Sequence, residues 1–267
     1  MKKKVKILRI LRTLNPKYGG PSSATIDSSL ALSKQNFKID IVTSDSKNSS
    51  FFKSKNIKIF NLGPAVGDFG FNIKLLFWLN KNKKKYDKFI IHGLWHFNTL
   101  LARLIIKKNY YVFTHGQLDP FFSTQFLKKI KKKIYWYFVE RKNLLKAESI
   151  LLTSENEKKS LTKTYVDTIG INKKVVDYGI LYPKIDLNIS KKLFFKKFSY
   201  LKNKDFFLYL GRFHQKKGCE ILIKSIKKII DKNINIKVLM VGPSNEYRKN
   251  LIKLSNSLNL KDTIFWS

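Results

Sequence analysis

The chain has 267 residues, 43% of them hydrophobic, so it is long and apolar enough to fold as one large or two ordinary domains, and disorder is excluded. Its 54 basic and 18 acidic residues give a formal net charge of +36, which favours a polyanionic partner such as nucleic acid or a membrane surface. Only six of the basic residues are arginine, and an excess of lysine, isoleucine and asparagine is typical of an AT-rich coding sequence. We therefore give the charge little weight.

No stretch approaches the ~20 consecutive apolar residues of a membrane-spanning helix. The start, MKKKVKILRILRTLN, is basic, but Arg9 and Arg12 interrupt its apolar part, so it lacks the core of a signal peptide. The single cysteine, Cys219, excludes an intrachain disulfide and suits a reducing compartment. We therefore expect a cytoplasmic protein whose membrane contact, if any, is peripheral and at the inner face.

Short β-rich runs alternate with helical patterns, which predicts an α/β fold of parallel strands with crossover helices. The expected strands of the first part are 5–10, 38–43, 57–60, 87–92, 110–115, 149–154 and 173–180, with helices at 22–35, 70–82, 97–107 and 123–146. After a lysine-rich connection that ends near residue 203, strands at 206–211 and 236–242 flank a helix, and a helix at 245–258 precedes the strand 262–267.

This order predicts two tandem Rossmann-like, doubly wound units, residues 1–180 and 181–267. Three strands are too few for a doubly wound sheet, so the second unit is expected to be incomplete, with the apolar faces of its strands poorly covered.

The stretch FLYLGRFHQKKG runs from a strand into a helix, at the kind of edge where open α/β sheets bind ligands. Gly211 permits a tight turn, Arg212 offers a two-pronged donor for a diphosphate, and Lys217 adds a positive charge. Taken alone, a solvated loop with incidental basic residues is the simpler interpretation in a chain this basic.

The first strand ends in the stretch LNPKYGGPSSATID. Gly19 and Gly20 permit close approach to the backbone, and Ser22 or Ser23 can cap the helix that begins there. The loop suits an anion, although a plain turn explains it equally well. It is not a G-x-G-x-x-G fingerprint and no acidic residue ends the next strand, which disfavours a nicotinamide enzyme.

Three histidines follow strand ends: His92 and His96 in IIHGLWHFN, and His115 in VFTHGQLDP. No cysteine or carboxylate accompanies them at ligand spacing, so no metal site is predicted. A lone histidine at a strand end is more often a hydrogen-bonded structural group than a catalyst. Two such positions, each followed by glycine at one edge of a sheet, favour a functional role as much as a structural one, and both interpretations stay open.

The segment 126–147 places five lysines (128, 129, 131, 132 and 133) ahead of the aromatic run 135–138. Such a stretch can rest on an anionic bilayer. It can equally be a crossover helix whose basic face is exposed to solvent.

Together and in this order, YGGPSSA, HGLW, THGQLDP, AESILLTSENE, VVDYGI, LYLGRFHQKKG and VLMVGPS resemble the landmarks of glycosyltransferase family 4, the retaining nucleotide-sugar transferases of GT-B fold. HGLW and HGQLDP are most similar to the branch that builds bacterial surface polysaccharides such as lipopolysaccharide. The resemblance implies transfer of a sugar from a nucleotide diphosphate donor to a lipid-linked or polysaccharide acceptor, with retention and with no metal or other cofactor.

The resemblance also implies roles for single residues. Gly19 and Gly20 would line the wall beside the donor phosphates, His115 would be the catalytic residue beside the sugar, and Arg212 and Lys217 would hold the diphosphate.

His92 and Trp95 of the HGLW stretch are expected on the acceptor side, in an acceptor-side domain 1–180. The E-x7-E motif of the family would fall after residue 267, so residues 181–267 are expected to be a partial nucleotide-sugar-binding domain of a truncated or split enzyme.

Two other functional interpretations are open from the sequence. The charge alone supports a basic nucleic-acid-binding protein, although no sequence-specific nucleic-acid motif is present. The missing motif supports a non-catalytic remnant.

Overall fold

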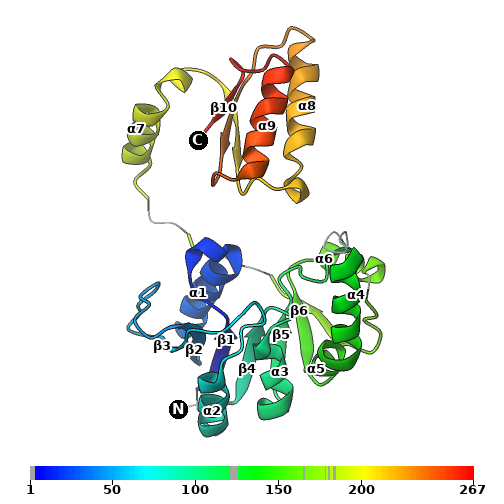
Figure 1. Ribbon diagram of the computed structural model, residues 1–267. Helices are drawn as coiled ribbons and strands as arrows, with labels where there is room; N and C mark the ends of the chain where they lie inside the picture. Colours follow the sequence, from blue (N-terminus) through cyan, green and yellow to red (C-terminus); the bar gives the residue numbers. More distant parts are fainter. Residues whose placement is uncertain (1–3, 121–125, 165, 178, 180, 183–184) are drawn as a thin grey trace. The chain divides into compact units, whose positions relative to one another are not determined.

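The computed structural model describes residues 4–120, 126–164, 166–177, 179, 181–182 and 185–267, with residues 126–129 described as backbone only. The chain divides into two compact units, Met1–Tyr182 and Pro183–Ser267 (Figure 1). The boundary expected from the sequence, after residue 180, lies two residues earlier.

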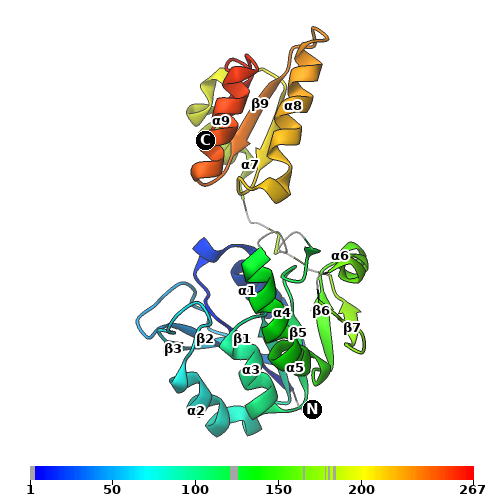
Figure 2. The ribbon, with the colours of Figure 1, turned by 45° about the vertical axis from the view of Figure 1, so that its right-hand side comes forward.

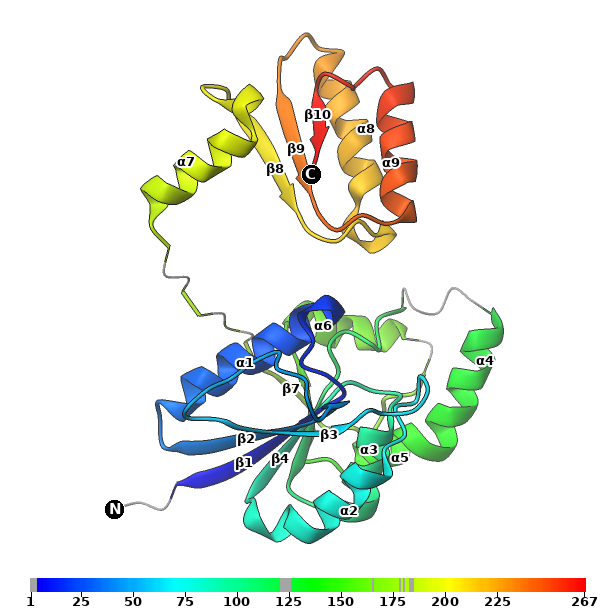
Figure 3. The ribbon, with the colours of Figure 1, turned by 60° about the vertical axis from the view of Figure 1, so that its left-hand side comes forward.

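The first unit is a sheet of seven parallel strands in the order β3-β2-β1-β4-β5-β6-β7, which confirms the predicted α/β class. Helix α1 lies on one face, and α2, α3 and α5 lie on the other (Figure 3). The strands are β1 Val5–Leu11, β2 Phe37–Ser46, β3 Lys58–Gly63, β4 Lys88–His92, β5 Tyr110–Phe113, β6 Ser149–Leu152 and β7 Lys173–Val175. The helices are α1 Gly20–Ser33, α2 Ile73–Asn82, α3 Phe97–Leu101, α4 Phe126–Tyr135, α5 Arg141–Leu145 and α6 Glu155–Ser160.

The strand order reverses at β1, which pairs with β2 on one side and with β4 on the other. Because all strands are parallel, their carboxyl ends meet at one edge, and the point of reversal leaves a crevice there. The loops that follow β1, β4 and β5 therefore come together, although they are far apart in the sequence.

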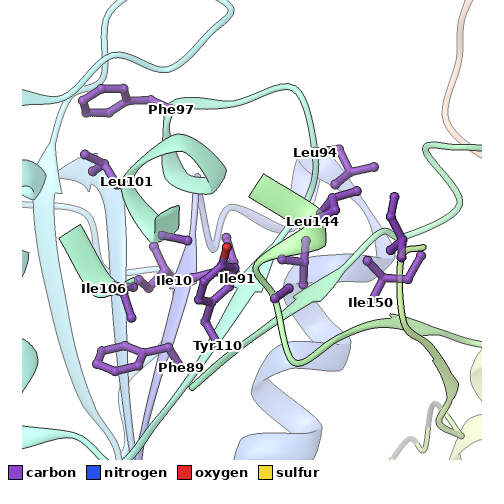
Figure 4. Packing of buried hydrophobic residues seen from close by; sticks show 14 of the residues in the cluster. Ile10, Phe89, Ile91, Leu94, Phe97, Leu101, Ile106, Tyr110, Leu144 and Ile150 are labelled. Carbon is purple, nitrogen blue, oxygen red and sulfur yellow. The ribbon is translucent and has the colours of Figure 1, made fainter. Parts of the chain in front are cut away.

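The core of the first unit fills the space between the central strands and the helices of the α3–α5 side (Figure 4). Tyr110 of β5 is fully buried, and its hydroxyl donates to the carbonyl of Asn143. Ile91, Leu94 and Leu101 of the same cluster are also fully buried. Burial of each such aliphatic side chain stabilises the fold by about 1.5–3 kcal/mol, so this packing fixes the strands that carry the site.

Two of the helices expected as continuous α-helices contain π-helical turns. One, Ala102–Ile106, follows α3, and the other, Trp136–Glu140, joins α4 to α5 (Figure 2). The second turn buries both Trp136 and Glu140. Among the described residues no helix has the length and apolar composition needed to cross a membrane.

The second unit has three parallel strands in the order β10-β9-β8, with α8 and α9 on one face and α7 on the other (Figure 3). Its elements are α7 Leu187–Lys197, β8 Phe206–Leu210, α8 Cys219–Ile230, β9 Lys237–Val241, α9 Glu246–Ser257 and β10 Ile264–Trp266.

The prediction of a lysine-rich connection up to residue 203 is wrong, because this segment contains α7. The Asp186 carboxylate caps the helix by accepting from the backbone N–H groups of Asn188 at 2.9 Å and Ile189 at 3.1 Å. Phe198 and Leu201, just after the helix, are buried against Leu239 of β9. The segment is thus part of the second unit.

The apolar strands of the second unit differ in their cover. Leu239 and Met240 of β9 are fully buried, so the expectation that this strand is poorly covered is wrong. Strand β8 does expose apolar side chains: Phe207 is 62%, Leu208 54% and Leu210 75% exposed. The side chains of β8 are therefore exposed on both faces of the sheet, because Phe207 and Leu208 point to opposite sides.

Gly242, at the end of β9, is predicted to be intolerant of any side chain. A β-carbon there would lie 2.1 Å from the Gly211 carbonyl oxygen and 3.0 Å from the Phe213 ring. Because the clash is with backbone, we expect Gly242→Ala to lower the free energy of unfolding of the second unit by about 1–3 kcal/mol. Urea unfolding monitored by hydrogen exchange measures this change. Gly20→Ala is the control, since a β-carbon there meets nothing within 4 Å. If the second unit unfolded at the same urea concentration in Gly242→Ala and in Gly20→Ala, the close approach of β8 and β9 would be contradicted.

Candidate functional site

A hollow of about 250 Å³ lies at the carboxyl edge of the first sheet. It is formed by the end of β1, the glycine loop before α1, and the turns that follow β4 and β5. The lining residues are Leu11, Arg12, Thr13, Tyr18, Pro21, Ser22, His92, Gly93, His96, His115 and Gln117. All three histidines that the sequence analysis singled out therefore line one cavity.

The glycine loop leaves the start of α1 open. Gly19 has φ +92°, in the region that favours glycine, and a β-carbon on Gly19 or Gly20 would meet nothing within 4 Å. The prediction that a serine caps α1 is wrong. Ser22 Oγ donates to the Thr13 carbonyl and Ser23 Oγ to the Gly20 carbonyl, both at 3.1 Å, and no side chain caps the helix. The free space beside an uncapped helix start suits an anion.

The turns after β4 and β5 are both left-handed. Gly93 has φ +88° and Gly116 φ +72°, but Trp95 and His115 also have positive φ, +66° and +49°. Non-glycine residues persist in this conformation where the surroundings hold them, and such positions cluster at functional sites. Two of the residues chosen from the sequence, Trp95 and His115, thus share an uncommon backbone geometry.

The Glu157 carboxylate holds the turn at His115. One oxygen accepts from the Thr114 hydroxyl at 2.9 Å and from the Gly116 N–H at 3.0 Å. The other accepts from the Thr153 N–H at 2.7 Å and the Thr153 hydroxyl at 2.8 Å. Glu157 was not among the residues predicted from the sequence. Its one signal is the capping-box spacing Ser154-x-x-Glu157, which predicts a helix start and not a bond to a distant turn.

Hydrogen bonds also join the turn after β4 to the turn after β5. The Gly93 N–H donates to the Phe113 carbonyl at 2.9 Å, and the Leu94 N–H donates to the Gln117 side-chain carbonyl. The hollow therefore has a rigid floor made of two turns that are separated by more than twenty residues of sequence.

His92 and His115 meet in this floor. Nδ1 of His92 lies 3.0 Å from Nε2 of His115 and 3.3 Å from the Thr25 hydroxyl of α1. Burial, then the positive charge of Arg9, holds the pKa of His92 well below its usual range. Burial lowers the pKa of His115 to about 4, although the charge of Glu157 opposes this and Arg9 adds to it. Both rings are therefore neutral at pH 7.

Trp95 faces away from the hollow. Its ring packs against Trp136, with ring centroids 5.7 Å apart, and Lys132 Nζ lies 5.4 Å from its centroid. Its backbone N–H donates to the buried Glu140 carboxylate at 3.3 Å, which also accepts from the Thr99 hydroxyl at 3.1 Å. Burial raises the pKa of Glu140 to about 7. The sequence expectation paired Trp95 with His92, but only His92 lines the hollow, and His92 is just 5% exposed.

In the second unit, Arg212 and Lys217 are exposed in the loop between β8 and α8. The Tyr209 hydroxyl donates to the Arg212 carbonyl at 2.8 Å, and the Asn245 amide donates to the Phe213 carbonyl at 2.9 Å. Phe213 is only 1% exposed and anchors the loop. The loop backbone is thus fixed while its cationic side chains stay in water.

Lys217 ends a short 3-10 turn, Gln215–Lys217, and Gly218 follows with φ +68° as the residue before α8. No side chain caps α8. The open N–H groups of a twelve-residue helix therefore lie beside Lys217, an arrangement that suits a phosphate group.

Within the described parts of the chain, no group of three or more histidine, cysteine, aspartate or glutamate side chains could hold a metal ion.

Residues 190–267 match the family model described as "Glycosyl transferases group 1". No curated protein matches the chain at a significant level.

Several solved structures are similar over nearly the whole chain. Sucrose-phosphate synthase from Thermosynechococcus elongatus is 18% identical with a TM-score of 0.72, over 98% of this chain and 70% of that one. A glycosyltransferase from Rickettsia africae is 18% identical with a TM-score of 0.67, over 99% and 68%. HepE from Anabaena, in complex with UDP and glucose, is 17% identical with a TM-score of 0.62, over 98% and 68%.

These likenesses show the fold. The chain has the α/β architecture of the GT-B glycosyltransferases, and its segment 190–267, which carries the Arg212 and Lys217 loop, matches the glycosyl transferases of group 1.

Proposed function

We propose that the chain is a retaining glycosyltransferase of family 4 that moves a sugar from a nucleotide diphosphate donor to a glycan or lipid-linked acceptor, in the building of bacterial surface polysaccharide. The observation that carries this proposal is the cationic loop with Arg212 and Lys217 at the open N-terminus of α8, inside the segment that matches group 1. The UDP and glucose bound to HepE support a nucleotide-sugar donor.

In this proposal the leaving diphosphate is stabilised by fixed positive charge. Negative charge grows on the diphosphate as the bond to the sugar breaks, so groups that already point at it lower the barrier without rearranging. Arg212, Lys217 and the helix N-terminus supply that charge, and no metal is required. On the first unit, the free space beside Gly19 and Gly20 would take a donor phosphate, and His115 would contact the sugar.

The cationic loop gives a direct binding test. We expect Arg212→Ala and Lys217→Ala each to weaken binding of a nucleoside diphosphate by about 1.5–3 kcal/mol, the scale of a hydrogen bond to a charged group, in calorimetric titration. A panel of nucleoside diphosphates covers the unknown base.

The matched control is Lys224→Ala, an exposed lysine of α8 beyond its first turn. It removes one positive charge from the helix that follows the loop and should leave affinity unchanged. Equal losses in all three variants, or salt-dependent binding of DNA with no response to nucleoside diphosphates, would favour the nucleic-acid alternative.

The glycine loop gives a second test. Because a β-carbon on Gly20 meets nothing within the protein, Gly20→Ala should leave the thermal midpoint unchanged. It should nevertheless weaken binding of a nucleotide sugar severalfold, since the new methyl group occupies the space proposed for the phosphates. Ser23→Ala, on the same exposed turn, is the control. Full affinity in Gly20→Ala would show that the ligand does not approach this loop.

We also propose that the continuous helical segment formed by α4, the π-helical turn Trp136–Glu140 and α5 rests on an anionic membrane, where a lipid-linked acceptor would be found. Its exposed apolar side chains repeat at helical spacing: Ile130 (43% exposed), Ile134 (57%), Tyr137 (70%) and Phe138 (62%). The exposed Lys131 and Lys133 flank this stripe, while the side chains of Lys128 and Lys129 lie outside the described residues. An apolar stripe with lysines beside it is typical of helices that lie in the membrane interface.

The chain is therefore expected to sediment with vesicles that contain phosphatidylglycerol and to be released by salt, because salt screens surface charge. Each basic residue near an anionic surface contributes roughly 1 kcal/mol to binding, which is a factor of about five. Lys131→Glu should therefore weaken vesicle binding by at least about fivefold. Phe138→Glu should weaken it at every salt concentration. The control is Phe77→Glu, which changes an equally exposed phenylalanine (65%) on α2. Equal binding to neutral vesicles, or no difference between Phe138→Glu and Phe77→Glu, would leave this helix as an ordinary solvated one.

A further inference from the structure

We propose that Thr25 of α1, acting through His92, holds the His115 imidazole in one neutral form, with its proton on Nδ1 and its Nε2 lone pair accepting from His92. His92 and Thr25 are thereby positioning residues. The inference concerns the imidazoles themselves. It rests on the proposed function only for the identity of the ligand that His115 contacts.

The Thr25 hydroxyl has one proton, and its contacts show where the proton lies. Thr25 Oγ1 is 2.7 Å from the Pro21 carbonyl oxygen, which can only accept, and 3.3 Å from His92 Nδ1. The proton follows the shorter contact, so the oxygen turns a lone pair toward His92. Nδ1 of His92 must then carry a hydrogen, because two lone pairs would repel at this distance.

The other nitrogen of His92 gives the same answer independently. His92 is 5% exposed, and its Nε2 has no hydrogen-bond partner within the described part of the chain. A buried N–H without an acceptor is among the rarest groups in proteins, whereas an unmet acceptor is better tolerated. A neutral His92 with its single hydrogen on Nδ1 avoids the costlier arrangement.

The hydrogen on His92 Nδ1 has two acceptors, His115 Nε2 at the shorter distance and Thr25 Oγ1 at the longer one. The two nitrogens are 3.0 Å apart, while the ring centroids are 5.2 Å apart and the ring planes differ by only 19°. The rings therefore meet edge to edge, which is the geometry of an N–H···N hydrogen bond. Since His92 donates, Nε2 of His115 accepts, and the proton of a neutral His115 lies on Nδ1.

The charges around the pair act in both directions. Arg9 of β1 disfavours a positive charge on either ring, and Glu157 of α6 favours one on His115. Burial is the largest effect and keeps the pKa of His115 at about 4. A charged His115 would also need a hydrogen on Nε2, directly opposite the one on His92. From pH 5 to 8, His115 can therefore donate from Nδ1 but cannot act as a base through Nε2.

The test reads the two rings directly. In the full chain labelled with ¹⁵N-histidine, long-range ¹H–¹⁵N correlation spectra distinguish a protonated from a bare ring nitrogen. Only four histidines are present, and His96→Gln and His214→Gln remove the other two signals. At pH 7 we expect both His92 and His115 to be protonated on Nδ1 and bare on Nε2, and His115 to stay so down to pH 5. A hydrogen on Nε2 of either ring at pH 7 would overturn the proposal.

The role of Thr25 is tested by paired variants. Thr25→Val keeps the shape and removes the oxygen, so a measurable share of His115 should appear with its hydrogen on Nε2. Thr25→Ser keeps the oxygen and should restore the wild-type spectrum, and Ser23→Ala on the same helix should not change it. Thr25→Ala serves if the valine variant does not fold. Wild-type spectra in both oxygen-free variants would remove Thr25 from the proposal. Since no nucleotide sugar is used, these outcomes are separate from those that test the proposed function.

Discussion

The carboxylate of Glu157 holds together the edge of the sheet on which the candidate site depends. It accepts from Thr114 and Gly116 on one side and twice from Thr153 on the other, so it joins the carboxyl ends of β5 and β6. His115 lies between Thr114 and Gly116 and has φ +49°. The four bonds offset the cost of this conformation, about 1–3 kcal/mol. These bonds therefore support the conformation in which His115 contacts His92.

A second carboxylate, that of Glu140, stabilises the neighbouring turn at Trp95 in a similar way. Glu140 is fully buried and accepts from the Trp95 N–H, the Thr99 hydroxyl and the Asn143 amide. It therefore fixes the left-handed Trp95 and the start of α3 from the opposite face of the sheet. Burial raises the pKa of Glu140 to about 7, above its usual value, so the unfolded state gives up this proton more readily. Its contribution to stability accordingly weakens as the pH rises from about 4.5 to 7.

Several arginines of the first unit make specific contacts, whereas Arg212 of the second unit is exposed. Arg9 donates to the Thr25 carbonyl at 2.9 Å, and Arg12 donates to the carbonyls of Asp68 and Gly67 at 2.9 and 3.1 Å. Arg103 donates to the Asn143 side chain at 2.7 Å. These contacts fix α1 and the loops around the hollow. A small number of arginines therefore says more about the site than the net charge of the whole chain.

The sequence by itself determined the class of fold and the positions of the candidate ligand-binding loops. Apolar runs such as VKILRIL become buried parallel strands, and the polar or glycine residues that follow them, His92, His115, Gly211 and Gly242, fall at the carboxyl ends because strand direction fixes that edge. Such patterns are local, so spacing along the chain is enough to read them.

Only the tertiary structure decided which of these residues meet. The contact between His92 and His115, the reach of Glu157 to the His115 turn, and the turning of Trp95 away from the hollow all depend on strand order and on left-handed turns. None of these has a periodic signal in the sequence. Helix α7 was hidden because its lysines resemble a linker, and its apolar residues gain their meaning only when they are buried against β9.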